Sequence, residues 1–290
     1  MAVPQSSTLD SPQAAALPEV VEPQVVKPNY TVAAISALVA GVLSTMLGVG
    51  GGIVVVPALT MFARVPIKRA AGNSLAFIFC VSAVSVTALF LSPQRHEIHL
   101  DVALVLAAGS VPGSLLGRWL NVRVPVRLFT YCFCFMLGLA AWRLLFPTLG
   151  VSLHLSTSLD LTHLPSVLYL LGVGLLAGIA AAMLGPGGGV VVVPALAIGF
   201  DLFGERFKTA TATSLAMILP VSLFSATLHA RAKNIDFKLV AIMVPFGIAS
   251  AIGGIFLREV VDGDILRKIF AAVMIAALVG LVVQVNKKKA

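Results

Sequence analysis

The sequence predicts an all-α membrane protein of about eight transmembrane helices, arranged as two homologous four-helix repeats. First, 59% of the 290 residues are hydrophobic and only 11% are charged, whereas soluble domains are closer to half apolar and a quarter charged. Second, Asp, Glu, Lys and Arg are absent from residues 28–63 and 161–200, and each run exceeds the roughly 20 residues that cross a bilayer. Third, a glycine-rich stretch occurs twice, as MLGVGGGIVVVPAL from Met46 and as MLGPGGGVVVVPAL from Met183.

Each glycine-rich stretch is predicted to break the first helix of its repeat. Glycine weakens a helix interior, and proline cannot donate the backbone hydrogen bond. Inside a bilayer, backbone freed in this way has to face protein or a water-filled cavity. We therefore expect helices over residues 30–47 and 53–62 around the first break, and over residues 166–184 and 190–200 around the second.

The other helices are predicted from apolar runs that are bounded by charged loops. One of them carries Gly109, Gly113 and Gly117 at every fourth position, a spacing that lets two helices approach closely. The expected ranges are 70–91, 100–120 and 129–146 in the first repeat, and 209–230, 239–257 and 269–285 in the second.

The chain is expected to divide into five segments. Because the first residues are rich in Pro, Gln, Ala, Ser and Val and lack a basic region followed by an apolar core, we expect a disordered tail there and no signal peptide. The repeat extends beyond the glycines, since Ser74-Leu75-Ala76 matches Ser214-Leu215-Ala216. The segments are a tail (1–29), the first transmembrane repeat (30–147), a polar linker (148–164), the second repeat (165–286) and a basic tail (287–290).

Loop charges predict an orientation in the membrane. Loops 64–69, 118–127, 201–208 and 258–268 hold more Lys and Arg than the others, which favours a cytoplasmic position for all four. Four spans in each half would give the two halves the same direction and place both termini outside. The three lysines near the C-terminus argue against this arrangement, and a re-entrant short helix after either glycine stretch would change it.

The two breaks are predicted to bind a small anion. A helix that starts inside a membrane presents unpaired N–H groups and the positive end of its dipole, and anions bind at such starts in transporters. Nearby amide and hydroxyl groups could add donors. The alternative is that the glycines serve only helix packing. The expected substrate-binding residues are Gly50, Gly51, Gly52, Asn73, Ser74, Gly187, Gly188, Gly189, Thr213 and Ser214.

Other site types are not supported by the sequence. A nucleotide-binding loop would need G-K-[ST] after its glycines, but Ile53 and Val190 stand there. The three cysteines lie in apolar runs without metal-ligand spacing, and His229 at a helix end is interpreted as an interfacial residue and not as a base. We therefore expect no cofactor, no metal and no catalysis. We also expect no nucleic-acid partner, because the net charge of +8 comes from short loops between apolar runs. The oligomeric state is left open.

The duplicated element G-V-G-G-G-x-x-x-x-P-A-L, each copy followed by a Ser-Leu-Ala helix, resembles the sulfite exporter TauE/SafE family, also called the domain-of-unknown-function-81 transporters. The resemblance extends from Tyr30 to Val285. It implies a multi-pass permease of the plasma membrane that exports sulfite or a small organosulfonate such as sulfoacetate. The two copies differ, since Pro186 and Thr213 of the second stand where the first has Val49 and Asn73.

Two other functions stay open on the sequence alone. A membrane scaffold or accessory subunit would use the glycines for packing only. A passive anion channel would conduct anions through the same pathway, with a flux that does not saturate as the substrate concentration rises. The cations Arg64, Lys68, Arg69 and Arg95 could attract anions, although loop charges that set the topology are the simpler interpretation.

Overall fold

The computed structural model describes residues 29–123, 126–147, 161, 163–185 and 187–287, and within these residues all regular structure is helical. The expected N-terminal tail and linker lie almost entirely outside the described residues. Every predicted helix is present, and two short 3-10 turns, η1 (Pro93–Glu97) and η2 (Gly204–Arg206), are additional. The helices are α1 (Tyr30–Leu47), α2 (Gly52–Met61), α3 (Ile67–Leu91), α4 (Leu100–Arg123), α5 (Val126–Leu145), α6 (Leu164–Leu184), α7 (Gly189–Gly199), α8 (Phe207–Arg231), α9 (Phe237–Val260) and α10 (Gly263–Lys287).

Seven of the described helices are long and apolar enough to cross a membrane, namely α1, α3, α4, α6, α8, α9 and α10. The eighth predicted span corresponds to α5, whose apolar stretch Thr130–Leu145 falls below this length. Several helices extend beyond their predicted ends because charged residues lie in their terminal turns. Thus α10 begins at Gly263 with Asp264 in its first turn, not at residue 269.

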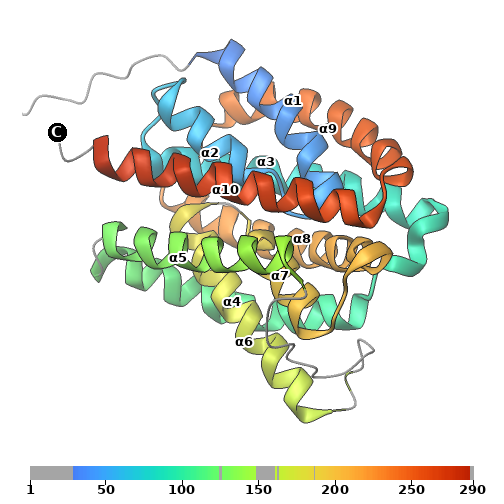
Figure 1. Ribbon diagram of the computed structural model, residues 1–290. Coiled ribbons are helices and arrows are strands. Elements are labelled where there is room, and N and C mark those ends of the chain that lie inside the picture. Colours follow the sequence, from blue (N-terminus) through green and yellow to red (C-terminus); the bar gives the residue numbers. More distant parts are fainter. Residues whose placement is uncertain (1–28, 124–125, 148–160, 162, 186, 288–290) are drawn as a thin grey trace, which may run out of the picture.

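The middle of the molecule is formed by α3 and α8, which run antiparallel. Near one end Gly72 of α3 contacts Asn234, which follows α8. At the other end the backbone N–H of His99, which follows α3, donates to Thr213 of α8. Around this pair, α1 packs along α9 and α4 packs along α6 (Figure 1).

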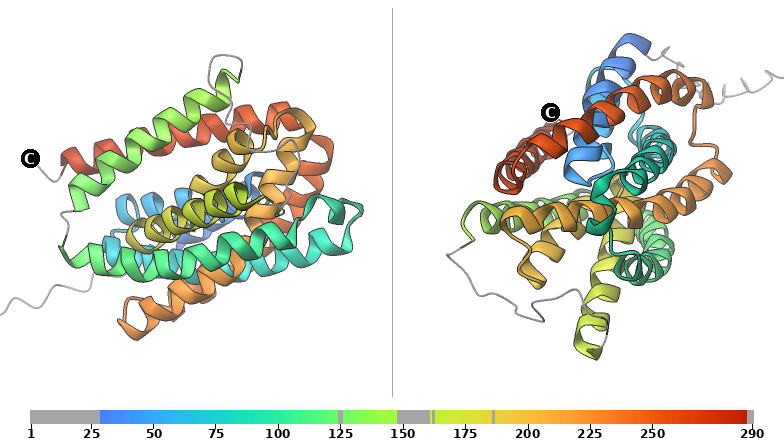
Figure 2. Two further views of the ribbon diagram at one scale, coloured as in Figure 1. Left: turned by 90° about the horizontal axis from the view of Figure 1, so that it is seen from below. Right: turned by 90° about the vertical axis from the view of Figure 1, so that its right-hand side faces the viewer.

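The charged connections therefore lie at two opposite ends of the molecule (Figure 1; Figure 2, left). Lys68 and Arg118 share a cavity with Asn234 at what we call the basic end. Arg258 contacts Glu97 and Lys208 at the opposite end, which we call the mixed-charge end. The prediction that loops 64–69, 118–127, 201–208 and 258–268 share one membrane face is thus wrong, because the first two lie at one end and the last two at the other.

The cause of this error is the path of the chain at each glycine stretch. A Cβ added at Gly51 would lie 2.7 Å from the carbonyl oxygen of Ala40 in α1, so the chain turns back beside α1. The short helix α2 then returns towards the basic end, where α3 begins. Gly188 lies against Ala177 of α6 in the same way. Each broken helix is therefore a hairpin that returns to its own side, the re-entrant alternative.

The glycines of α4 contact the backbone of α6. A Cβ at Gly113 would overlap the carbonyl oxygen of Leu175, and Cβ atoms at Gly109 and Gly117 would also come too close to other carbonyl oxygens of α6, the second at 2.8 Å. On α6 itself, Gly172 is exposed, and no atom lies within 4 Å of a Cβ added there. The predicted small-residue stripe is therefore a helix–helix contact.

We expect Gly113→Leu to lower the stability of the folded protein by about 3 kcal/mol or more, because an overpacked contact has no room to relax. The thermal unfolding midpoint in detergent measures the effect. Gly172→Leu adds the same side chain to the same helix pair on its exposed side and should change the midpoint little. Equal losses in the two variants would contradict the contact.

Candidate functional site

The two glycine breaks have the same local structure. Helix α1 ends at Leu47, and Gly48, Gly50 and Gly51 adopt left-handed φ values of 67°, 80° and 74° before α2 begins. In the second break, the φ values of Gly185, Gly187 and Gly188 are 81°, 87° and 81°. These values favour glycine because other residues pay a steric penalty there. Pro57 and Pro194 lie inside the short helices and therefore do not make the breaks, whereas Pro186 of the second stretch lies outside the described residues.

The two breaks meet at the centre of the molecule. A Cβ at Gly189 would overlap the carbonyl oxygen of Gly48, and one at Gly187 would lie 3.4 Å from the carbonyl oxygen of Val49. Both breaks lie beside α3 and α8 near the middle of these helices, at Ile78 and Ile218. The expected glycine residues of the two halves are therefore side by side, and all six are buried.

Ser74 of α3 and Ser214 of α8 fix this contact by hydrogen bonds that cross between the two halves of the chain. The Ser214 hydroxyl donates to the carbonyl oxygen of Gly48 at 2.8 Å, and the Ser74 hydroxyl donates to that of Gly185 at 3.2 Å. Each serine thus closes the break of the opposite half. Both hydroxyl protons are used in this way, and direct contact of these serines with a substrate stays a prediction.

Asn73 and Thr213 hold the starts of two long helices. The backbone N–H of Asp236, just before α9, donates to Asn73 Oδ1 at 2.7 Å. The backbone N–H of His99, just before α4, donates to Thr213 Oγ1 at 3.3 Å. Asn73 also keeps a buried amide nitrogen, Nδ2, without a hydrogen-bond partner. These two residues lie one position before the serines, yet they contact the ends of helices and not the glycine breaks.

The starts of α2 and α7 provide backbone donors inside the protein. The first bonds within α2 run from the N–H groups of Val54 and Val55 to Gly51, and the amides before them have no partner within the helix. The start of α7 is built in the same way around Gly188. Neither start has a side-chain cap. Two buried, positively polarised helix ends therefore converge.

Little space is open beside these helix starts. The side chain of Ile78 lies 2.9 Å from a Cβ position at Gly50 and 3.2 Å from one at Gly187. A cavity of about 30 Å³ next to Gly52 is lined by apolar side chains, which is roughly the volume of one water molecule in the liquid. The structure is therefore closed at its centre.

A larger polar cavity of about 140 Å³ opens at the basic end. Its polar lining comes from Lys68, Arg118, Ser225, His229 and Asn234. Its wall also includes Ala182, one turn before the second glycine break. No sequence pattern connects these residues, which come from three different helices and a connection.

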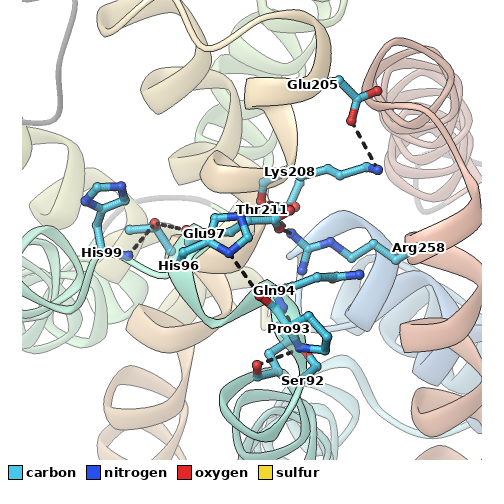
Figure 3. Close-up of polar contacts among 12 residues, drawn as sticks. Ser92, Pro93, Gln94, His96, Glu97, His99, Glu205, Lys208, Thr211 and Arg258 are labelled. Atoms are coloured by element: carbon cyan, nitrogen blue, oxygen red, sulfur yellow. Dashed lines mark hydrogen bonds and ion pairs between the residues drawn. The ribbon is translucent and has the colours of Figure 1, made fainter.

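The mixed-charge end is closed by a buried ion pair (Figure 3). Arg258 is fully buried, and its Nη2 donates to Glu97 Oε2 and to the carbonyl oxygen of Lys208, both at 2.6 Å. The Glu97 side chain is 14% exposed. Sequence reasoning missed this pair because its members lie 161 positions apart and are joined only by the packing of α9 beside α3.

A family model described as sulfite exporter TauE/SafE matches residues 7–144 and 170–290. The chain belongs to the TauE/SafE family. It is therefore a membrane transporter, as its curated relatives are also named, and a multi-pass protein of the cell membrane.

Three relatives illustrate how this TauE/SafE protein compares with others. It is 25% identical to "Probable membrane transporter protein YunE" of Bacillus subtilis over 75% of its own length and 84% of the relative. It is 36% identical to a "Probable membrane transporter protein" of Methanocaldococcus jannaschii over 36% of its length, and 33% identical to another protein of that name in Haemophilus influenzae over 42%. These two matches span 40% and 47% of the relatives, less than half of each. No solved structure matches the chain.

Proposed function

We propose that this protein is a secondary permease that exports a small anion, sulfite or an organosulfonate, bound between two repeats at the starts of α2 and α7. One observation carries the proposal: two buried helix starts meet at the centre of a membrane transporter. Unpaired N–H groups and the positive helix ends favour a negative charge at that point. An oxyanion can accept several such hydrogen bonds at once.

The proposed architecture is a pair of inverted repeats, residues 30–147 and 165–286, each with one hairpin and three further crossings, including α5 and α10 as spans. The antiparallel packing of α3 and α8 supports the inversion. So does the reciprocal packing of α1 along α9 and of α6 along α4. Inverted repeats with interrupted helices at their interface are characteristic of secondary transporters, which open the same site alternately to each side.

The driving force of transport is proposed to be the membrane potential together with the anion gradient. Each Asp and Glu of the described residues lies in a connection or in a terminal turn of a helix. A proton relay through carboxylates at mid-depth is therefore not part of the proposal. Moving one negative charge outwards is favoured by about 2.3 kcal/mol per 100 mV of inside-negative potential.

Flux measurements in proteoliposomes test this function. We expect labelled sulfite or sulfoacetate to cross at a rate that saturates with concentration and rises with an inside-negative potential. A rate equal to that of protein-free liposomes for every anion tried would favour a scaffold, and a rate that increases without saturation would favour a channel. Either outcome would refute the permease.

A further inference from the structure

We propose that the cavity between Lys68, Arg118 and His229 at the basic end is a second anion-binding site, a vestibule in which the anion is held before it reaches the centre. The proposal rests on the proposed function only in taking the transported anion as its ligand. The site is separate from the glycine breaks, and the substrate-site prediction included none of its residues.

The cations of this cavity have no internal counter-charge. Among the described residues, neither Lys68 nor Arg118 has a carboxylate within salt-bridge distance. The guanidinium of Arg118 is held at the wall because its Nη1 donates to the carbonyl oxygen of Leu228 at 3.2 Å. The remaining N–H groups of an arginine form a planar fork that suits an oxyanion.

Neutral polar groups complete the lining. Nδ1 of His229 is buried and has no hydrogen-bond partner. Buried polar atoms without partners are rare, and an anion that keeps part of its hydration would bring a water molecule that can donate to this nitrogen. The hydroxyl of Ser225, which faces Ser114 at 3.2 Å, and the side chain of Asn234 also line the space.

The mixed-charge end, at the other end of the α3–α8 pair, shows that a cation in this position is paired with an anion. Lys68 and Lys208 hold corresponding positions, because each lies six residues before the serine of the repeat. At Lys208 the neighbouring cation, Arg258, already has an internal anion in Glu97. At Lys68 the neighbouring cation is Arg118, and the cavity remains open. An external anion would take at the basic end the place that the Glu97 carboxylate takes at the mixed-charge end.

The size and position of the cavity agree with this role. Its volume of about 140 Å³ corresponds to roughly four or five water molecules at about 30 Å³ each, which is enough for a small oxyanion with part of its hydration. Arg64, in the loop before α3, adds a further cation to the basic end, and such an excess of Lys and Arg is typical of the cytoplasmic face. An exported anion would meet this cavity first.

Calorimetric titration of sulfite into the purified full-length protein tests the site. Arg118→Gln and Lys68→Gln should each weaken sulfite binding by about tenfold or more, which is the scale of one charge-assisted hydrogen bond. Two matched controls remove the same charge nearby: Arg123→Gln on α4, whose guanidinium stacks on Trp119, and Arg69→Gln, the neighbour of Lys68. We expect both controls to stay within about twofold of the parent protein. Equal weakening in cavity variants and controls would overturn the site.

The titration also distinguishes a sulfite site in this cavity from a site for a lipid headgroup. A lipid phosphate could use the same cations, so the measurement is made without anionic lipid and then with added phosphatidylglycerol. Loss of sulfite binding at low lipid content would overturn the proposal in favour of a headgroup site. A protein that binds sulfite through Arg118 but shows no flux would refute the permease and support the vestibule. Normal flux together with unchanged sulfite binding in Arg118→Gln would support the permease and refute the vestibule.

Discussion

Gly188→Ala is expected to lower saturable anion flux by more than tenfold while the protein still folds. The φ of Gly188 is 81°, and an added methyl group would lie 3.2 Å from the carbonyl oxygen of Ala177, which is tight but tolerable. The methyl group would cover the start of α7 and strain its backbone by about 1–2 kcal/mol. Flux in proteoliposomes and the unfolding midpoint in detergent measure the two effects.

Gly204→Ala is the matched control for this prediction. Gly204 also has a positive φ, 64°, but nothing lies within 4 Å of an added Cβ. Its variant carries a similar backbone penalty far from the central contact, so we expect a comparable shift in the midpoint with flux retained. Unchanged flux in Gly188→Ala would show that the start of α7 does not contact the transported anion.

Glu97→Gln is expected to cost about 3–5 kcal/mol of folding free energy, since it leaves the Arg258 guanidinium buried without a negative partner. Arg258 also has two nitrogens, Nε and Nη1, that lack hydrogen-bond partners, so it depends strongly on Glu97. Removing both charges with Glu97→Gln and Arg258→Met should recover much of the loss. The thermal midpoints of the two single variants and the double variant measure this coupling.

Glu205→Gln provides the comparison for an exposed ion pair. Glu205 lies 3.2 Å from Lys208 with a side chain that is 68% exposed, and such pairs contribute about 0–1 kcal/mol. The amide oxygen of Gln can still accept the N–H of Gly263, which Glu205 Oε1 accepts at 3.0 Å. If Glu97→Gln proves as mild as Glu205→Gln, the Arg258 pair does not stabilise the mixed-charge end.

The helices could be predicted from the sequence because each is an apolar run that is bounded by charged or polar residues. Both breaks were also predictable, because consecutive glycines destabilise a helix interior. The direction of the chain after the break was not. A glycine with a positive φ permits either continuation or reversal, and the contact of Gly51 with Ala40 that decides between them is tertiary.

The candidate site was predictable to the same extent. The repeat of the glycine stretch correctly indicated that two similar elements exist, and the structure brings them together. It did not reveal that Ser214 bonds to Gly48 of the opposite half, because these residues lie 166 positions apart and meet only through tertiary packing. The cavity at Arg118 and the pair at Arg258 were missed for a related reason. Their partners are distant in sequence, and cations near helix ends usually only set the topology.

The exchanged serine bonds make the two halves of the chain mutually dependent. The carbonyl oxygen of Gly48 receives its hydroxyl donor from the second half, and that of Gly185 receives its donor from the first. Neither half alone supplies a hydrogen-bond donor for the backbone carbonyl at its own hairpin tip, and a lipid environment does not supply one either. Each hairpin tip therefore requires the other half in the same membrane, and the covalent link between the halves guarantees that both are present in equal number.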